Sequence, residues 1–304
     1  MILSVSRRTD IPCCYPQWFM ERLRAGFALT RNPVNPSQIS KVSLSPGVVD
    51  CIVFWTKDPG PLMPYLDELD SMGYRYYFQF TLTPYGRDLE PGLRERLERI
   101  KTLLALSNRL GAHRVLWRYD PILLDENHTA AWHQAQFATL CHTLKGAAGR
   151  VTISFLDLYP RLRRAGFRVI TEAEAFPLAT ALAAAAAEHG LSICSCAEPW
   201  DLTPCGISPG ACIDYELIRR LCGCELDLPP DKNQRPACLC RESVDIGSYD
   251  TCTNGCAYCY ADHGRTARPA YDPHSPLLCG KLLPAETVRE RECRSLLNPQ
   301  LKLY

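Results

Sequence analysis

The chain has 304 residues, of which 46% are hydrophobic and 22% are charged, and its formal net charge is +1. This balance is typical of a globular protein with one or two domains and a sizeable core, and it argues against binding to nucleic acid or membranes through bulk charge. The opening residues MILSVSRRTDIP lack the apolar run of a signal peptide, and no stretch is apolar for the length of a membrane span. The sequence therefore predicts a cytoplasmic protein.

Six short apolar or β-branched segments in the first 195 residues predict β-strands, at 2–6, 48–55, 74–82, 114–119, 150–156 and 191–195. Apolar residues at helical spacing predict helices between and after them, over 16–26, 61–73, 93–111, 129–146, 173–190 and 212–223. Alternating strands and helices favour parallel pairing, either in an α/β barrel or in an open doubly wound sheet. We expect a TIM-like partial (β/α)6 barrel over residues 1–196.

Charged side chains follow several of these strands directly. Ligand sites in parallel α/β folds lie at the carboxyl ends of the strands, and fixed charges beside buried strands need partners or a ligand. The residues concerned are Arg7, Arg8, Asp10, Lys57, Arg118 and Asp120. The sequence thus predicts a site at this end of the sheet, although a structural Arg–Asp network is an equal alternative for the first three.

Seventeen cysteines are many for such a chain, and thirteen of them lie between Cys194 and Cys293. An odd number without a secretion signal makes a disulfide framework a poor explanation and favours metal-binding or catalytic cysteines. Because regular periodicity is hard to find in much of the Cys-rich part, we expect metals to organise it. We therefore predict a second segment, residues 197–304, that folds over the mouth of the barrel.

The strongest motif is YDTCTNGCAYCYADHG, which places Cys252, Cys256 and Cys259 at the spacing C-x3-C-x2-C. Thiolates are the standard ligands of iron–sulfur clusters, and a loop of this spacing can hold three corners of a 4Fe-4S cluster. Gly255 would let the backbone pass close to the inorganic sulfides. One iron would then remain open to a small molecule. A structural zinc site with a fourth cysteine and a closed electron-transfer cluster are the alternatives.

This spacing, with Tyr258 before the third cysteine, resembles the signature of the radical S-adenosylmethionine enzymes, and CTNGCAYCYA is especially similar to their spore photoproduct lyase-like branch. The resemblance implies that S-adenosylmethionine chelates the open iron. It implies that an electron, from a donor such as a flavodoxin or a ferredoxin, cleaves the cofactor to methionine and a 5′-deoxyadenosyl radical. The radical would act on an unknown substrate. Nucleic acid is an option raised by the lyase, but the near-neutral charge disfavours it.

The whole chain also resembles an uncharacterised bacterial domain-of-unknown-function family, through SRRTDIP, FWTK, WRYDP and DIGSYDTCTNGCAYCYA. In radical S-adenosylmethionine enzymes the three cysteines follow the first strand, whereas here they lie near the far end of the sequence. Either the barrel is circularly permuted, or the C-terminal segment folds back over the barrel mouth. Both arrangements would bring a cluster to the carboxyl ends of the strands.

A second cysteine set, Cys196, Cys212, Cys238 and Cys240, is included in the full-length resemblance. Four thiolates suit a second, closed iron–sulfur cluster or a zinc ion. Other cysteines compete for these positions, namely Cys194, Cys205, Cys222 and Cys224. The remaining candidates are interpreted as small buried hydrophobic residues, and these are Cys51, Cys141, Cys279 and Cys293.

If S-adenosylmethionine binds, its carboxylate needs a cation and its ribose needs acceptors. Lys57 and Arg118 are the candidate cations, and Asp120 and Asp157 are the candidate acceptors. Thr81, with Gln79 and Thr83 on the same strand face, is predicted to line the interior. Tyr258 or Tyr260 would pack near the adenine or shield the cluster.

Other polar features have simpler explanations. His128, His133 and His142 share a helix and are interpreted as surface or core residues, and the basic stretch 161–168 as a solvated helix start rather than a phosphate site. The main alternative to an enzyme is a non-enzymatic iron–sulfur electron-transfer protein or a zinc-stabilised binding module.

Overall fold

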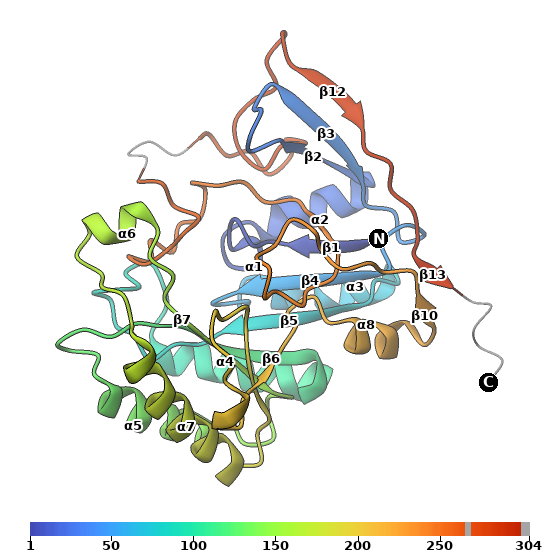
Figure 1. The fold of residues 1–304 in the computed structure, drawn as a ribbon. Helices are drawn as coiled ribbons and strands as arrows, with labels where there is room; N and C mark the ends of the chain where they lie inside the picture. The colour runs from blue at the N-terminus through green and yellow to red at the C-terminus, as the bar shows by residue number, and fades with distance from the viewer. Residues whose placement is uncertain (265–268, 299–304) are drawn as a thin grey trace.

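The computed structural model describes residues 1–264 and 269–298, and its centre is a parallel sheet of eight strands (Figure 1). The strand order is β11-β1-β4-β5-β6-β7-β8-β9, and every neighbouring pair is parallel. The strands are β11 (Val244–Asp245), β1 (Ile2–Val5), β4 (Cys51–Thr56), β5 (Tyr76–Thr81), β6 (Val115–Ile122), β7 (Val151–Phe155), β8 (Ile193–Ser195) and β9 (Ser208–Pro209). The predicted α/β class with parallel strands is confirmed.

One face of this sheet forms the main core with the helices that the sequence predicted between the strands. Successive residues of a strand point to opposite faces of the sheet, so every second residue faces the same side. Tyr76, Phe78 and Phe80 of β5 therefore enter this core together. Phe54 stacks on Phe78 with ring centroids 4.8 Å apart. The helices are α2 (Pro16–Ala25), α3 (Leu66–Ser71), α4 (Arg96–Leu110), α5 (Ala130–Thr143) and α7 (Glu172–Glu188).

The opposite face is covered by the second half of the chain. Tyr77 of β5 points to this face, and its hydroxyl donates a 2.6 Å hydrogen bond to the carbonyl oxygen of Cys212. Helix α8 (Tyr215–Cys222) begins three residues after Cys212. The side chain of Asp214 accepts from the backbone N–H of Leu217 and caps the helix. Tyr77, Cys212 and the buried residues of α8 share one apolar cluster.

A smaller three-stranded sheet joins the two ends of the chain. It contains β2 (Phe27–Arg31), β3 (Gln38–Ser43) and β12 (Thr287–Glu290), and Figure 1 shows red β12 beside blue β3. The remaining elements are β10 (Glu225–Leu226), β13 (Leu297–Asn298), α1 (Ile11–Cys14), α6 (Pro160–Arg164), η1 (Met63–Tyr65), η2 (Ala112–Arg114) and η3 (Thr203–Cys205). The large sheet takes strands from both predicted segments, since β9 and β11 lie beyond residue 196.

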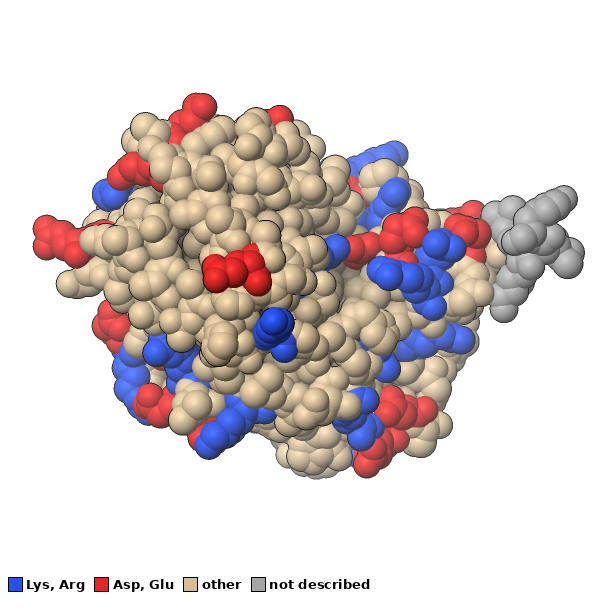
Figure 2. Space-filling model, turned by 90° about the horizontal axis from the view of Figure 1, so that it is seen from below, with Lys and Arg blue, Asp and Glu red and all other residues tan. Residues whose placement is uncertain are grey.

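The surface carries both signs of charge. On the face seen in Figure 2, basic and acidic side chains are interspersed around a wide uncharged area, as the net charge of +1 predicts. Among the described residues, none of the helices has the length and apolar character needed to cross a bilayer.

Candidate functional site

The three-cysteine motif lies at the carboxyl ends of the parallel strands. We call residues 246–264 the cysteine loop; it follows β11, which pairs with β1 at the edge of the sheet. Asp245, the last residue of β11, accepts hydrogen bonds from the hydroxyls of Ser4 at 2.8 Å and Ser6 at 2.7 Å and from the backbone N–H of Arg7 at 2.7 Å. The loop therefore leaves the sheet beside the segment that follows β1.

Asp10 connects three segments at this end of the sheet. Its Oδ1 accepts from the backbone N–H of Cys13 at 3.0 Å, and its Oδ2 accepts from the backbone N–H of Lys57 at 2.7 Å and from the side-chain amide of Asn254 at 3.0 Å. Burial raises the pKa of Asp10 to about 6, against the opposing effect of these donors. The carboxylate thus joins the segments after β1 and β4 to the cysteine loop.

Glu90 is a buried carboxylate with cations on two sides. Its Oε1 lies 2.9 Å from Nζ of Lys57 and accepts from the hydroxyls of Thr83 and Tyr258, while its Oε2 lies 3.1 Å from Nη2 of Arg99. Although burial alone would raise the pKa of Glu90, the charges of Lys57 and Arg99 hold it below its usual value. Lys57 also lies 2.9 Å from the hydroxyl of Tyr258, so this network fixes the centre of the cysteine loop.

The backbone of the cysteine loop is held against the segment that follows β5. The N–H of Gly92 donates to the carbonyl of Asn254, and the N–H of Ala257 donates to that of Leu89, both at 2.9 Å. A Cβ on Gly92 would lie 2.5 Å from the carbonyl oxygen of Thr253, so the contact requires glycine. Gly255 has φ of +65°, which also favours glycine.

The three thiols of the loop are shielded from solvent. Cys256 is buried, and Cys252 and Cys259 are half-buried. Burial raises the pKa of the Cys256 thiol, while the nearby charge of Lys57 opposes that shift. Sequence reasoning assigned no role to Cys14, yet the hydroxyl of Thr253 donates to its Sγ at 3.1 Å. Among the described residues, no group of three or more His, Cys, Asp or Glu side chains is arranged so that it could hold a single metal ion.

The second predicted cysteine set comes together on the face of the sheet that α8 covers. The Sγ atoms of Cys196 and Cys212 lie 3.4 Å apart, and the backbone N–H of Cys212 donates to the Sγ of Cys240 at 3.3 Å. A hydrogen bond from Cys240 lowers the pKa of the Cys238 thiol to about 7. Three of the competing cysteines contact other groups: Cys194 lies beside Thr152, Cys205 beside the carbonyl of Phe176, and Cys222 beside the carbonyl of Asp50.

Two arginines accompany this second set. Nη1 of Arg118 donates to the Sγ of Cys212 at 2.6 Å, and Arg118 also pairs with Asp120. Arg7 and Arg118 lie over the ring of Trp55, with their guanidinium carbons 5.0 and 5.4 Å from its centroid. Within the described residues, the buried Nε1 of Trp55 and Oε1 of Gln79 have no hydrogen-bond partner. Cations and unsatisfied polar atoms thus surround the four thiols.

The other predicted cofactor residues are spread over the same edge of the sheet. Thr81 is half-buried at the end of β5, and Gln79 donates to the carbonyl of Cys212 at 2.8 Å. Asp157 is exposed and pairs with Arg235, so it is not grouped with Lys57. The hydroxyl of Tyr260 donates to the carbonyl of Arg7.

The histidines and the basic stretch have structural partners. His133 is buried between the hydroxyl of Tyr119 and the carbonyl of Leu123, each at 2.8 Å, while His128 pairs with Asp125. His142 lies on the exposed side of α5. In the stretch 161–168, predicted to be a solvated helix start, Arg161 donates to the carbonyl oxygens of Cys259 and Asp262 and so contacts the cysteine loop.

Residues 2–261 of the chain match the protein family described as "Domain of unknown function (DUF1848)". This match covers most of the sequence, and it confirms the predicted resemblance to a domain-of-unknown-function family. No curated protein and no solved structure matches the chain.

Proposed function

We propose, for a chain that belongs to the domain-of-unknown-function family DUF1848, a radical S-adenosylmethionine-type activity with a 4Fe-4S cluster on Cys252, Cys256 and Cys259. The single observation that carries the proposal is the position of the cysteine loop. It follows β11, and β11 pairs in parallel with β1 at the edge of the large sheet. Counted from β11, the three cysteines follow the first strand, as they do in the enzymes that the motif resembles.

This strand order supports a circularly permuted partial barrel rather than a tail that merely covers the mouth. The six strands from β11 through β7 would form the (β/α)6 unit, with its mouth at their carboxyl ends. The helices between these strands contribute to one core on a single face of the sheet, and α8 with the second cysteine set occupies the other. A barrel has the same division between an outer layer of helices and an inner face.

The side chains at the loop suit an anionic cluster with one open corner. Thiolates are the proper donors, and Lys57 beside Cys256 supplies positive charge that offsets theirs. A cluster places its ligands around a body larger than one ion, so the three thiols need not converge on a single point. When S-adenosylmethionine is bound, such a cluster supplies the electron that releases methionine and a 5′-deoxyadenosyl radical.

The protein residues then position the cofactor and exclude water. Lys57, which Glu90 and Tyr258 hold beside the loop, is assigned to the cofactor carboxylate. Thr81 is assigned to the inner wall beside the adenosyl group. Tyr258 fixes the loop through its buried hydroxyl. Arg118 and Asp120 are assigned to the second cysteine set instead, because Arg118 already donates to Cys212. Asp157 is left without a cofactor role.

The second cysteine set is proposed to hold a closed iron–sulfur cluster, which places its ligands around a body larger than one ion. Four thiolates on one divalent or cluster centre leave net negative charge, and the buried guanidiniums of Arg7 and Arg118 offset it. A closed cluster here would pass electrons from a flavodoxin- or ferredoxin-type donor to the cysteine loop. A zinc ion would first require these thiols to move together, since within the described residues no such group is arranged around a single ion.

Electron paramagnetic resonance tests the proposal directly. The protein is purified without oxygen, reconstituted with iron and sulfide, reduced, and measured with and without S-adenosylmethionine. An open-corner cluster changes its spectrum on addition of the cofactor and yields 5′-deoxyadenosine and methionine, and Cys256→Ser abolishes both responses. Cys141→Ser, in the apolar core, serves as the control. If S-adenosylmethionine leaves the spectrum unchanged, the proposal is wrong and the protein is an electron carrier. If the protein takes up only zinc, it is a binding module.

A further inference from the structure

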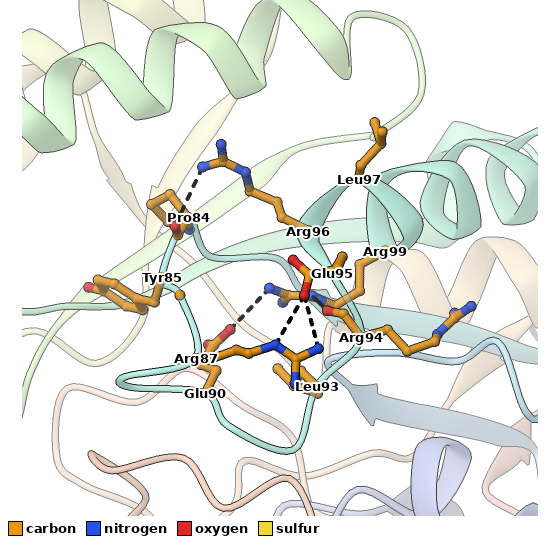
Figure 3. A pocket seen from close by; sticks show the side chains of 11 residues that line it. Pro84, Tyr85, Arg87, Glu90, Leu93, Arg94, Glu95, Arg96, Leu97 and Arg99 are labelled. Atoms are coloured by element: carbon orange, nitrogen blue, oxygen red, sulfur yellow. Dashed lines mark hydrogen bonds and ion pairs between the residues drawn. The ribbon is translucent and has the colours of Figure 1, made fainter.

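We propose that a pocket at the start of α4 binds the phosphate group of a small molecule, independently of any cluster on the cysteine loop. The pocket has a volume of about 390 Å³ and opens between the segment after β5 and the first turn of α4 (Figure 3). This volume lies within the range of roughly 300–1,000 Å³ that is usual for small-molecule sites. The proposed cofactor site shares Glu90 with the wall of this pocket, through the bond from Lys57, and uses none of its arginines.

The charge of the pocket wall favours an anion. Four arginines and two glutamates line it, an excess of positive charge; the basic residues are Arg87, Arg94, Arg96 and Arg99. Arg94 is neutralised by Asp58 at 2.5 Å, and Arg87 by Glu95 at 2.9 Å. Within the described residues, the side-chain partners of Arg96 are neutral, namely Oε1 of Gln136 at 2.7 Å and the carbonyl of Pro84 at 3.4 Å.

Arg99 supplies the second, independent indication of a ligand. Its side chain lines the pocket and is only 2% exposed. Nε donates to the carbonyl of Arg94 at 3.2 Å and Nη2 lies 3.1 Å from Glu90, but Nη1 has no hydrogen-bond partner among the described residues. A buried guanidinium N–H without an acceptor is costly, and an oxyanion in the adjoining pocket would supply one.

The backbone adds donors at the same place. No side chain caps the N-terminus of α4, a helix of 15 residues. The N–H of Glu98 already donates to the carbonyl of Glu95, which leaves the N–H groups of the first two helical residues for an anion. The guanidinium of Arg96, the Nη1 of Arg99 and this helix terminus therefore face one volume. Glu90 separates that volume from Lys57 and the cysteine loop, because its two oxygens face opposite sides. The pocket is thus adjacent to the proposed catalytic site and distinct from it.

Titration calorimetry at constant ionic strength tests the site, with inorganic phosphate, glycerol 3-phosphate and glycerol as probes. We expect saturable binding of the two phosphates and none of glycerol. Tighter binding of glycerol 3-phosphate would identify a phosphate ester as the ligand class, and equal or tighter binding of inorganic phosphate would identify the free anion; both support an oxyanion site. Absence of saturable phosphate binding, or binding that chloride at the same ionic strength reproduces, overturns it.

Variants of α4 locate the binding. Arg96→Gln and Arg99→Met should each weaken phosphate binding about tenfold or more, since each removes a charge-assisted hydrogen bond. Arg109→Gln is the matched control, because Arg109 lies in the last turn of the same helix and pairs with Asp67 and Asp70. Arg96 is exposed, so its variant remains informative if the Arg99 variant fails to fold. Equal weakening by Arg109→Gln would mean general electrostatics and would refute the site.

Discussion

Asp10 and Asn254, separated by 244 residues in the sequence, are joined by a hydrogen bond of 3.0 Å from the side-chain amide to the carboxylate. The same carboxylate also accepts hydrogen bonds from the backbone N–H groups of Lys57 and Cys13. One carboxylate thus links the cysteine loop to the segments that follow β1 and β4.

Asp10→Ala should loosen the cysteine loop from the segments after β1 and β4, while its backbone contacts with the segment after β5 remain. The substitution leaves three buried donors without their acceptor, and we expect the free energy of unfolding to fall by roughly 2–3 kcal/mol. Urea unfolding measures this loss, and iron retained after reconstitution reports the loop. Asp67→Ala, on the exposed side of α3, is the control. Unchanged stability together with full iron content would show that the loop does not depend on Asp10.

Gly92→Ala tests the close approach of the loop more selectively. The new Cβ would lie 2.5 Å and 2.8 Å from the backbone oxygens of Thr253 and Asn254, and backbone atoms cannot move aside as a flexible side chain can. We expect the variant to fold but to retain much less iron than the wild type. Gly47→Ala has only Ser45 Oγ, at 3.8 Å, near its new Cβ and should behave as the wild type. Equal iron content in the wild type and both variants would contradict the close contact between Gly92 and the cysteine loop.

Metal analysis should separate the two cysteine sets. Cys212→Ser removes a thiol that lies 3.4 Å from Cys196 and accepts from Arg118, so we expect it to lose the metal of the second set only. Cys194→Ser changes a neighbouring thiol that contacts Thr152 and should lose nothing. Iron and zinc are counted per chain, and the ratio identifies the second centre. Equal metal content in the two variants would remove the second site from the proposal.

His133 should make the protein less stable in mild acid. Burial lowers its pKa from 6.5 to about 4, so above pH 6.5 the ring is neutral in both states. Between pH 6.5 and 4 the unfolded chain binds a proton that the folded chain does not, and the free energy of unfolding falls as the pH falls. The expected loss between pH 8 and pH 5 is about 2 kcal/mol.

The measurement is urea unfolding at the two pH values. His133→Gln, which can keep hydrogen bonds to Tyr119 and the carbonyl of Leu123, should lose this part of the pH dependence. His142→Gln, on the exposed side of the same helix, should retain it. The groups near the ring, Tyr119 and the Asp125–His128 pair, are unchanged in both variants. Identical pH profiles for the two variants would exclude His133 as the cause.

The sequence predicted strands and helices best where a regular apolar pattern extends over many residues. The six predicted strands correspond to β1, β4, β5, β6, β7 and β8, and the helices of 16–26, 93–111, 129–146 and 173–190 are present with slightly different ends. The hairpin of β2 and β3 and the short strands β9 and β11 were missed. Val244–Asp245 is too short to show any period, and it becomes a strand only because the edge of β1 is there to pair with.

The sequence pointed to the cysteines of the candidate site, but it did not reveal most of the residues that hold them in place. Spacing predicted Cys252, Cys256 and Cys259 as one set, and the full-length resemblance grouped Cys196, Cys212, Cys238 and Cys240. Glu90 was missed because RDLEPG looks like an ordinary polar loop, and only tertiary packing buries its carboxylate between Lys57 and Arg99. Arg99 was missed because it fits the regular polar and apolar pattern of a helix. Such residues gain their roles from partners that are distant in sequence, and periodicity cannot reveal those.

The pairing of β11 with β1 has a consequence for how the protein is made. The ribosome completes β1 long before its neighbour at residues 244–245, which emerges last among the strands of the large sheet. At elongation rates of about 5–20 residues per second, the nascent chain carries an uncovered strand edge for roughly 10–50 seconds. That edge stays open to other strands until residues 244–245 arrive, and the proposed cluster could assemble on its three cysteines only after translation has passed Cys259.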